Sequence, residues 1–294
     1  MSAWIRTPEK LRGMGMTVRC DLAGKVVAVT GASRGLGAVA ARAFAQAGAQ
    51  VALLGRTEQD LEEQAAYIGS SALPIVADVG HPEDVRRAFA LIDEKFGRLD
   101  VLVNNAATMA HALIQEATDE DISSIVGSNF LGPIYTTRAA IPAMRRVGSG
   151  HILNISTEGT MFPEAPYLGL YVATKTGLDM FSRVSYEELK PLGIRVTLIV
   201  PGAMQPRDPG PELAARPGTD PQRVAKIVNA LEVSGHLALL RDGNRAYCED
   251  VVDAMLFAIS APHSCAIDVI RVRPFPEVPV EEPLADTTAL SVSS

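Results

Sequence analysis

Seven short apolar runs, separated by stretches of helical character, most constrain what this chain can fold into. Each run is bounded by turn residues, which is typical of strands buried on both faces of a sheet. The runs lie at residues 25–29, 51–54, 73–77, 101–103, 151–155, 194–200 and 266–272. Helices are expected between and after them, at residues 38–47, 58–68, 82–96, 119–147, 171–189 and 249–260. Alternating strands and helices predict an α/β fold, in which a doubly wound, seven-stranded, mostly parallel sheet carries helices on both faces.

The same pattern predicts one large domain with flanking extensions. Residues 21–274 form the domain, because 294 residues, 47% of them apolar, suffice for a single large core. Residues 1–20 show no clear period and are predicted to be a loose extension. Residues 275–294 are proline-rich and acidic, which predicts disorder. The segment 203–245, with a possible helix at 222–233, follows the end of a strand, where a substrate lid would lie; a surface loop without a role is the alternative.

Composition excludes several classes of protein. The net charge of −7 argues against a nucleic-acid partner. No apolar run is long enough to span a membrane, and the N-terminus lacks the apolar stretch of a secretory signal. Cys20, Cys248 and Cys265 are too far apart to indicate a disulfide framework, and His111 and His151 have no third ligand for a metal. A reducing, cytoplasmic setting fits best.

A glycine-rich turn joins the first strand to the first helix. It reads Thr-Gly-Ala-Ser-Arg-Gly-Leu-Gly over residues 30–37. Glycines permit a tight turn and close approach to a phosphate, and the helix N-terminus offers N–H groups to the anion. Its place between a strand and a helix therefore predicts a dinucleotide site. The candidate cofactor-binding residues in the turn are Gly31, Ser33, Arg34, Gly35, Leu36 and Gly37.

The second strand ends without the acid that holds the ribose hydroxyls in NAD-binding units. Arg56 stands there instead, and Arg34 lies in the glycine turn. Two guanidinium groups could clamp a 2′-phosphate, although either one alone is more often a solvated surface charge. Together they favour NADP(H) over NAD(H) as the cofactor.

Tyr171 and Lys175 are four residues apart at the start of a predicted helix, so they share one face. A free tyrosine has a pKa near 10 and is a poor base at neutral pH. A nearby lysine cation favours the phenolate and lowers that pKa. The pair could then act as acid and base in a carbonyl–alcohol interconversion. Taken alone, this spacing is common by chance.

Several further motifs occur in order, and together they resemble the single-domain branch of the short-chain dehydrogenase/reductase family over about residues 21–274. The glycine turn and the Tyr-x-x-x-Lys pair match that family. So do Asp78-Val79 after the third strand, Asn-Asn-Ala-Ala at 104–107, Asn129, the strand that ends in Ser156-Thr157, and Pro201-Gly202. The resemblance implies a Rossmann fold and the catalytic set Asn129, Thr157, Tyr171 and Lys175. It implies further cofactor contacts at Asp78, Val79, Asn105, Ala106, Ala107, Tyr171, Lys175, Pro201 and Gly202.

The chain also departs from the family pattern. Thr157 stands where the family usually has its catalytic serine, and Ser156 is the alternative hydroxyl. Ala107 replaces a glycine, and the threonine expected soon after Pro201-Gly202 is missing. Glu158 and Glu164 flank the expected substrate side, where they could select a polar or cationic substrate; solvated carboxylates are the alternative.

The resemblance implies an oxidoreductase that interconverts a small-molecule ketone or aldehyde and an alcohol with NADP(H). Tyr171 would be the acid and base, Thr157 would position the carbonyl oxygen, and Asn129 would anchor a water in a proton relay. An NADP(H)-sensing regulator without catalysis is the alternative, although it would not need the Tyr171–Lys175 pair. A dehalogenase-like variant is disfavoured because the dinucleotide turn is whole. In the family that the chain resembles, helices like those expected at 119–147 and 171–189 commonly pair across a two-fold axis, so the resemblance implies a homodimer or homotetramer.

Overall fold

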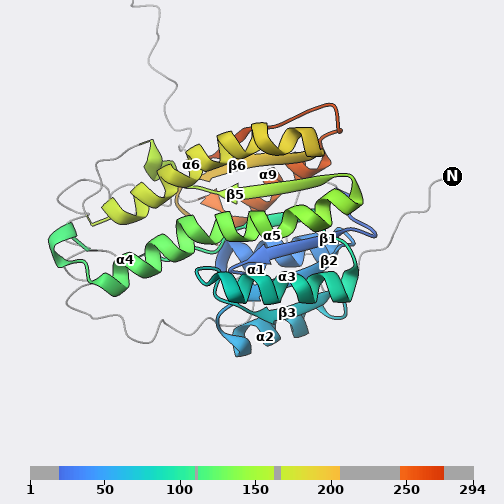
Figure 1. The fold of residues 1–294 in the computed structure, drawn as a ribbon, viewed down its shortest axis with the longest axis horizontal. Coiled ribbons are helices and arrows are strands. Elements are labelled where there is room, and N and C mark those ends of the chain that lie inside the picture. The colour runs from blue at the N-terminus through green and yellow to red at the C-terminus, as the bar shows by residue number, and fades with distance from the viewer. Residues whose placement is uncertain (1–19, 110–111, 162–166, 206–245, 275–294) are drawn as a thin grey trace, which may run out of the picture.

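A single parallel sheet organises the computed structural model, which describes residues 20–109, 112–161, 167–205 and 246–274 (Figure 1). Its seven strands follow the order β3-β2-β1-β4-β5-β6-β9, and every neighbouring pair is parallel. The strands are β1 (Val26–Thr30), β2 (Gln50–Gly55), β3 (Ala72–Val76), β4 (Val101–Asn104), β5 (Gly150–Ile155), β6 (Ile194–Pro201) and β9 (Val269–Val272). The prediction of a seven-stranded doubly wound sheet is confirmed.

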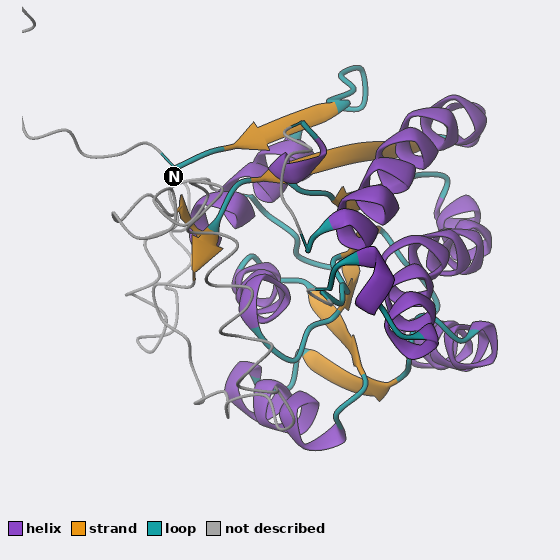
Figure 2. Ribbon diagram, turned by 90° about the vertical axis from the view of Figure 1, so that its left-hand side faces the viewer, coloured by secondary structure: helices purple, strands orange, loops and turns teal. Residues whose placement is uncertain are grey.

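One face of the sheet is covered by α1 (Gly35–Gln46), α2 (Glu58–Ile68) and α9 (Cys248–Ser260), whose apolar side chains share one core cluster. Helix α1 is rich in alanine and is buried from Leu36 to Phe44, and its small side chains let it pack closely against α9. Figure 2 shows the strands between this layer of helices and a second one.

The second layer consists of α3 (Pro82–Phe96), α5 (Gly132–Val147) and α6 (Gly169–Leu189). Helix α3 begins with a proline in its first turn, where the missing N–H costs nothing, and ends at Gly97 in the left-handed region. Phe89 and Met144 bury their side chains against the sheet from this side. The two layers together place helices on both faces, as the alternating pattern predicts.

The predicted helix at 119–147 is interrupted by a π-helical turn. Helix α4 (Asp119–Val126) begins at Thr118, whose hydroxyl accepts the Asp121 N–H in a capping box. The π-helical turn η3 (Gly127–Leu131) follows and leads directly into α5. This turn places Asn129 against the loop after β4, and such turns are frequent at functional sites.

Smaller differences from the expected elements have local causes. Helix α1 begins at Gly35 rather than at residue 38, and β9 begins at Val269 rather than at 266. Just before β9, the Thr197 hydroxyl donates to the Ile267 carbonyl oxygen at 2.6 Å. The short elements are η2 (Ile114–Glu116), η4 (Glu158–Thr160), η5 (Lys190–Leu192), β7 (Met204–Gln205) and β8 (Ala246–Tyr247).

Several predictions fall outside the described residues. They are the extension at 1–20 except Cys20, the tail at 275–294, and the lid at 203–245 beyond residue 205, with its possible helix at 222–233. At the ends of that segment, β7 pairs with β8 in parallel. In the described part of the chain, no helix is both long and apolar enough to cross a membrane.

The strand order places a crevice beside β1. The chain runs from β1 outward to β2 and β3 and then returns to β4 on the other side of β1. In such sheets, ligands bind where the order reverses, at the carboxyl ends of the strands. The glycine-rich turn after β1 and the loop after β4 both lie at this point, so the fold positions a site between them.

Candidate active site

A pocket of about 260 Å³ opens at the carboxyl ends of the strands. Most of the predicted cofactor-binding residues line it: Gly31, Ser33, Arg34, Leu36, Arg56, Asp78, Val79, Asn105, Ala106 and Ala107. Gly55, Thr57, Ala77, Thr108 and Ser128 also line it and were not predicted from the sequence. The pocket lining does not include the predicted Gly35, Gly37, Tyr171, Lys175, Pro201 and Gly202.

Two glycines of the turn have no room for a side chain. Gly31 has a φ of +65°, and a Cβ there would lie 2.8 Å from the Cα of Ala106. A Cβ on Gly37 would lie 2.2 Å from the Gly31 carbonyl oxygen. The turn is therefore pressed against the loop after β4, which leaves its backbone facing the pocket.

Thr30 and Asn105 tie the turn to that loop. The Asn105 side-chain amide donates to the carbonyl oxygens of Thr30 at 2.9 Å and of Gly31 at 3.2 Å. The Thr30 hydroxyl donates to the Val103 carbonyl oxygen at 3.2 Å and accepts the N–H groups of Asn105 and Ala106 at 3.0 Å each. Asn105 thus shapes the pocket through its side chain. Thr30 was missed as a site residue, although a hydroxyl at the first position of the glycine-rich turn was a visible signal.

Arg34, Arg56 and Asp78 come together at one pocket, as the sequence predicts. The Arg56 side chain is 57% exposed, and its Nη1 lies 3.9 Å from Asp78 Oδ2. The other carboxylate oxygen of Asp78 accepts the Gly80 N–H at 2.8 Å. Two guanidinium groups, a fixed carboxylate and the start of α1 fit the phosphate and ribose groups of a dinucleotide.

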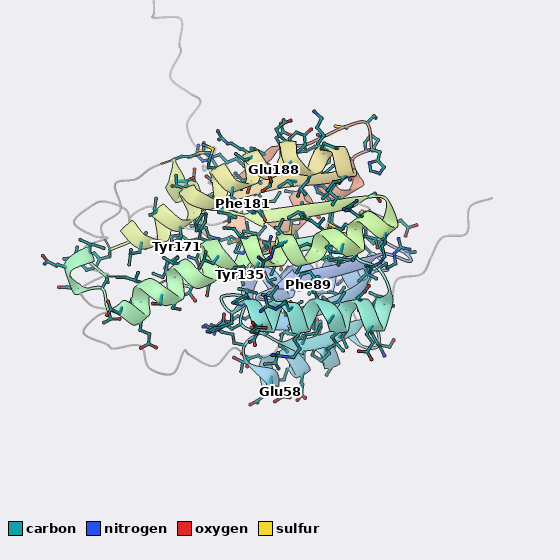
Figure 3. All side chains as sticks on the ribbon, in the orientation of Figure 1. Glu58, Phe89, Tyr135, Tyr171, Phe181 and Glu188 are labelled. Atoms are coloured by element: carbon teal, nitrogen blue, oxygen red, sulfur yellow. The ribbon has the colours of Figure 1, made fainter. Side chains whose placement is uncertain are left out.

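Tyr171 and Thr157 meet at the carboxyl end of β5. Tyr171 lies on the end of α6 nearest to where the strands finish, and Glu188 marks the opposite end (Figure 3). Burial raises the pKa of Tyr171, and the neighbouring Thr157 hydroxyl acts in the opposite direction. The sequence predicts a pKa lowered by Lys175, but in the structure burial dominates.

Lys175 is buried one turn further along α6. Its Nζ donates to the carbonyl oxygen of Ile155 at 2.6 Å. Burial lowers the pKa of Lys175 to about 8, and the negative charge of Asp179 opposes that change. At neutral pH the side chain is therefore an ammonium group held against the end of β5, close to the Thr157–Tyr171 pair.

Ser156 and Thr157, the two alternative hydroxyls, point to different partners. Ser156 is buried, and its hydroxyl donates to the carboxylate of Asp179. Thr157 reaches Tyr171 and also accepts the Gly159 N–H at 3.3 Å. Successive side chains of a strand point to opposite sides, which explains the division. Thr157 is the hydroxyl next to the phenol, and its role as the hydroxyl donor stays a prediction.

Asn129 connects the two parts of the site. Its side-chain oxygen accepts the Thr108 N–H at 2.7 Å, and its amide donates to the Thr108 carbonyl oxygen at 2.9 Å and to the Thr174 hydroxyl at 3.3 Å. Thr108 lines the pocket, whereas Thr174 lies on α6 between Tyr171 and Lys175. The fully buried Asn129 side chain therefore links the pocket to α6.

Glu158, which was expected on the substrate side, forms ion pairs in the structure. Its carboxylate pairs with Arg271 and with Arg273, whose Nε lies 2.7 Å away. The Glu158 side chain is 18% exposed and already paired with two arginines, and its part in selecting a polar or cationic substrate stays a prediction. Its other oxygen lies against Gly202, where a Cβ would come within 2.8 Å of it. Glu164 lies outside the described residues.

Comparisons with known proteins agree with this geometry. A family model described as short chain dehydrogenase matches residues 25–209. The chain belongs to the short-chain dehydrogenase/reductase family. An uncharacterized oxidoreductase of Staphylococcus saprophyticus is 35% identical over 223 residues, which cover 74% of this chain and 95% of the relative. An uncharacterized oxidoreductase of Staphylococcus aureus is 29% identical over 260 residues, or 88% of this chain and 100% of the relative.

Solved short-chain dehydrogenase/reductase structures share the fold. A metagenomic short-chain oxidoreductase in complex with NADP has a TM-score of 0.69 and 26% identity, over 87% of this chain and 99% of its own. The 3-ketoacyl-(acyl-carrier-protein) reductase from Brucella melitensis, complexed with NADH, has a TM-score of 0.71 and 27% identity, over 86% of this chain and 98% of its own. This short-chain dehydrogenase/reductase is accordingly an NAD(P)-dependent oxidoreductase with a Rossmann fold.

Proposed function

We propose that this enzyme interconverts a small-molecule ketone or aldehyde and the corresponding alcohol, with Tyr171 as the acid and base. The observation that carries the proposal is that Thr157, which follows β5, lies beside Tyr171 on α6, with Lys175 buried one turn away. Two adjacent hydroxyls can both bond one carbonyl oxygen, and one of them can give it a proton.

Each residue then has a defined task in carbonyl reduction. A bound nicotinamide dinucleotide supplies the hydride that reaches the carbonyl carbon. Tyr171 transfers its phenolic proton to the carbonyl oxygen, so the product is a neutral alcohol and the tyrosine is left as a phenolate. Lys175 stabilises that phenolate through its positive charge. Thr157 donates a hydrogen bond to the same oxygen and so positions it. The phenolate regains a proton from solvent, and alcohol oxidation follows the reverse course.

Asn129 is a positioning residue in this scheme. Thr108 and Thr174 occupy the polar atoms of its side chain, so that side chain orders the loop after β4 and α6 rather than touching substrate. The predicted water relay would then rest on groups other than the Asn129 side chain. This placement explains why a fully buried asparagine lies in a π-helical turn between the pocket and the catalytic helix.

NADP(H) is the proposed cofactor in preference to NAD(H). Arg34 and Arg56 line the same pocket, and the end of β2 carries no carboxylate that would repel a 2′-phosphate. Arg56 is exposed, and its Nη1 lies 3.9 Å from Asp78 Oδ2, beyond hydrogen-bonding range, so a phosphate can compete for its guanidinium. Tyr171, Lys175, Pro201 and Gly202 are proposed to hold the nicotinamide end.

The proposed assembly is a homodimer or homotetramer in the cytoplasm. Met180 and Val184 lie one turn apart on α6 and are 58% and 51% exposed. In a dimer, the corresponding helices of a second copy of the chain would cover this face and remove both side chains from water. Light scattering should therefore give a multiple of 31.2 kDa, whereas a 31 kDa species at micromolar concentration would contradict the assembly.

The direct test of the function is the loss of NADPH absorbance with a panel of ketones and aldehydes. Turnover with at least one compound, and loss of that turnover in Tyr171→Phe, is the expected result. The alternative is an NADP(H)-sensing regulator. Tight NADPH binding without turnover of any carbonyl compound, in the reductive direction or with alcohols and NADP in the reverse direction, would favour it.

A further inference from the structure

A polar chain runs from the end of β5 into α6 beneath Tyr171. The Ser156 hydroxyl donates to the Asp179 carboxylate, and the preceding residue, Ile155, accepts the Lys175 ammonium through its carbonyl oxygen. Asp179 lies one helical turn after Lys175, a spacing at which opposite charges on a helix attract. Ile155, the last residue of β5, thus holds Lys175, and the next residue, Ser156, holds Asp179.

The surroundings of Lys175 strengthen the electrostatic effect of the Asp179 carboxylate on its ammonium group. Ser156 is 3% exposed and Lys175 is 2% exposed, so water screens the ammonium poorly. Among the described residues packed around Lys175, α6 itself contributes Tyr171 and Asp179. The turn η4 contributes Glu158, whose charge is already paired with Arg271 and Arg273. The π-helical turn and the C-terminal halves of β5 and β6 contribute no charged group, and the acids of α4 lie in its own first turn.

We propose that Asp179 is a positioning residue of this active site, whose carboxylate, anchored by Ser156, keeps the buried Lys175 side chain in its charged ammonium form next to Tyr171. Its effect on turnover rests on the proposed function, but its effect on the charge of Lys175 does not. Asp179 touches no reacting atom and acts only through Lys175. Ser156, the serine that could have been the catalytic hydroxyl, orients Asp179 instead.

The sign of the pH effect follows from the pKa of Lys175, which is about 8 in the folded protein. Lys175 is charged at pH 7 and mostly neutral at pH 10, so Asp179 attracts it only at the lower pH. Asp179→Asn removes the attraction and keeps an oxygen that accepts the Ser156 hydroxyl. The loss of stability should therefore be larger at pH 7 than at pH 10.

The test compares melting temperatures of the full chain without cofactor, for the unmutated protein and Asp179→Asn. We expect the variant to lose about 2–4 °C more at pH 7 than at pH 10. In a Lys175→Met background, the same substitution should have equal effects at both pH values. If Asp179→Asn lowers the melting temperature equally at pH 7 and pH 10 in the protein that retains Lys175, the proposal is overturned. A carboxylate with a purely structural role would have the same effect at both pH values. If Asp179→Asn does not fold, Asp179→Ser takes its place in the same comparison, with and without Lys175→Met.

A second measurement connects the charge to turnover. In carbonyl reduction, the alkaline limb of the kcat/KM profile should move to lower pH by about one unit in Asp179→Asn. Asp179→Glu should restore it, and Ser156→Ala should move it less. An unmoved limb in an active Asp179→Asn enzyme contradicts the proposal. Absence of turnover in the unmutated protein instead contradicts the proposed function, while the melting experiment still decides the role of Asp179.

Discussion

The pocket beside β1 and the proposed catalytic group on α6 are built in opposite ways. In the pocket, backbone and exposed charge carry recognition: Gly31 and Gly37 have no room for a Cβ, and the Arg56 side chain is 57% exposed. In the catalytic group, the polar side chains are withdrawn from water, and Lys175 is 2% exposed. An exposed guanidinium is screened by salt, whereas a buried ammonium has large electrostatic effects on its neighbours. Changes in the pocket should therefore alter affinity moderately, and changes on α6 should alter turnover strongly.

Asn129 joins these two regions without belonging to either. It bonds the backbone of Thr108, which lines the pocket, and the hydroxyl of Thr174, which lies between Tyr171 and Lys175. The connection is positional, because it fixes where the regions lie and supplies no charge. The comparison predicts that their energetic contributions are separable.

The largest effect is expected from Tyr171→Phe, which breaks the catalytic region alone. The substitution removes one hydroxyl and little volume, so turnover should fall by at least about 10²-fold while the dissociation constant of NADPH stays nearly unchanged. Steady-state kinetics and fluorescence titration measure the two quantities. Near-normal turnover would show that Tyr171 is not the acid.

The next largest effect is expected from substitutions that distinguish the two hydroxyls after β5, those of Thr157 and Ser156. Thr157→Val should lower turnover by about 10²-fold, as for removal of a positioned donor, and Thr157→Ser should stay within about tenfold of the unmutated enzyme. Ser156→Ala should be milder than Thr157→Val, because Ser156 bonds Asp179 rather than Tyr171. The reverse order of damage would assign the donor role to Ser156.

A smaller effect is expected from Arg56→Ala, which changes the pocket alone. Loss of a charge-assisted hydrogen bond to the 2′-phosphate should weaken NADPH binding by about tenfold or more. NADH lacks that phosphate and serves as the matched ligand, so its affinity should hardly change. If NADPH and NADH have equal dissociation constants in the unmutated protein, Arg56 does not recognise the 2′-phosphate and is a solvated surface charge.

The smallest effect is expected from a change in salt concentration, which should alter cofactor binding in the pocket more than turnover. Raising ionic strength from about 0.01 M to about 0.15 M shortens the screening length from roughly 30 Å to 8 Å. NADPH affinity should fall by a few-fold and NADH affinity by less, because only the former uses the exposed arginines. Turnover of the saturated enzyme should be insensitive, since Lys175 is buried. A salt-sensitive turnover rate would mean that the catalytic charges are more exposed than this structure has them.

Local patterns in the sequence predicted most of the fold and the pocket. The apolar runs gave the strands, and the glycine turn with Arg34 and Arg56 gave a pocket that the structure assembles. The Tyr171–Lys175 spacing is likewise local. Contacts between distant residues could not be predicted: Glu158 pairs with Arg271, 113 positions away, and Ser156 reaches Asp179, 23 positions away. No local pattern specifies such partners, because side-chain pairing depends on how strands and helices pack.

The central claim, that binding and turnover reside in separate regions, is tested most directly by the double variant Tyr171→Phe with Arg56→Ala. Its turnover at saturating NADPH and its NADPH dissociation constant are both measured beside those of the single variants. The account predicts that the double variant has the turnover of Tyr171→Phe and the NADPH dissociation constant of Arg56→Ala, because the free-energy effects of independent sites add. It would be contradicted by slower saturated turnover in Arg56→Ala alone, or by Tyr171→Phe weakening NADPH binding as much as Arg56→Ala does.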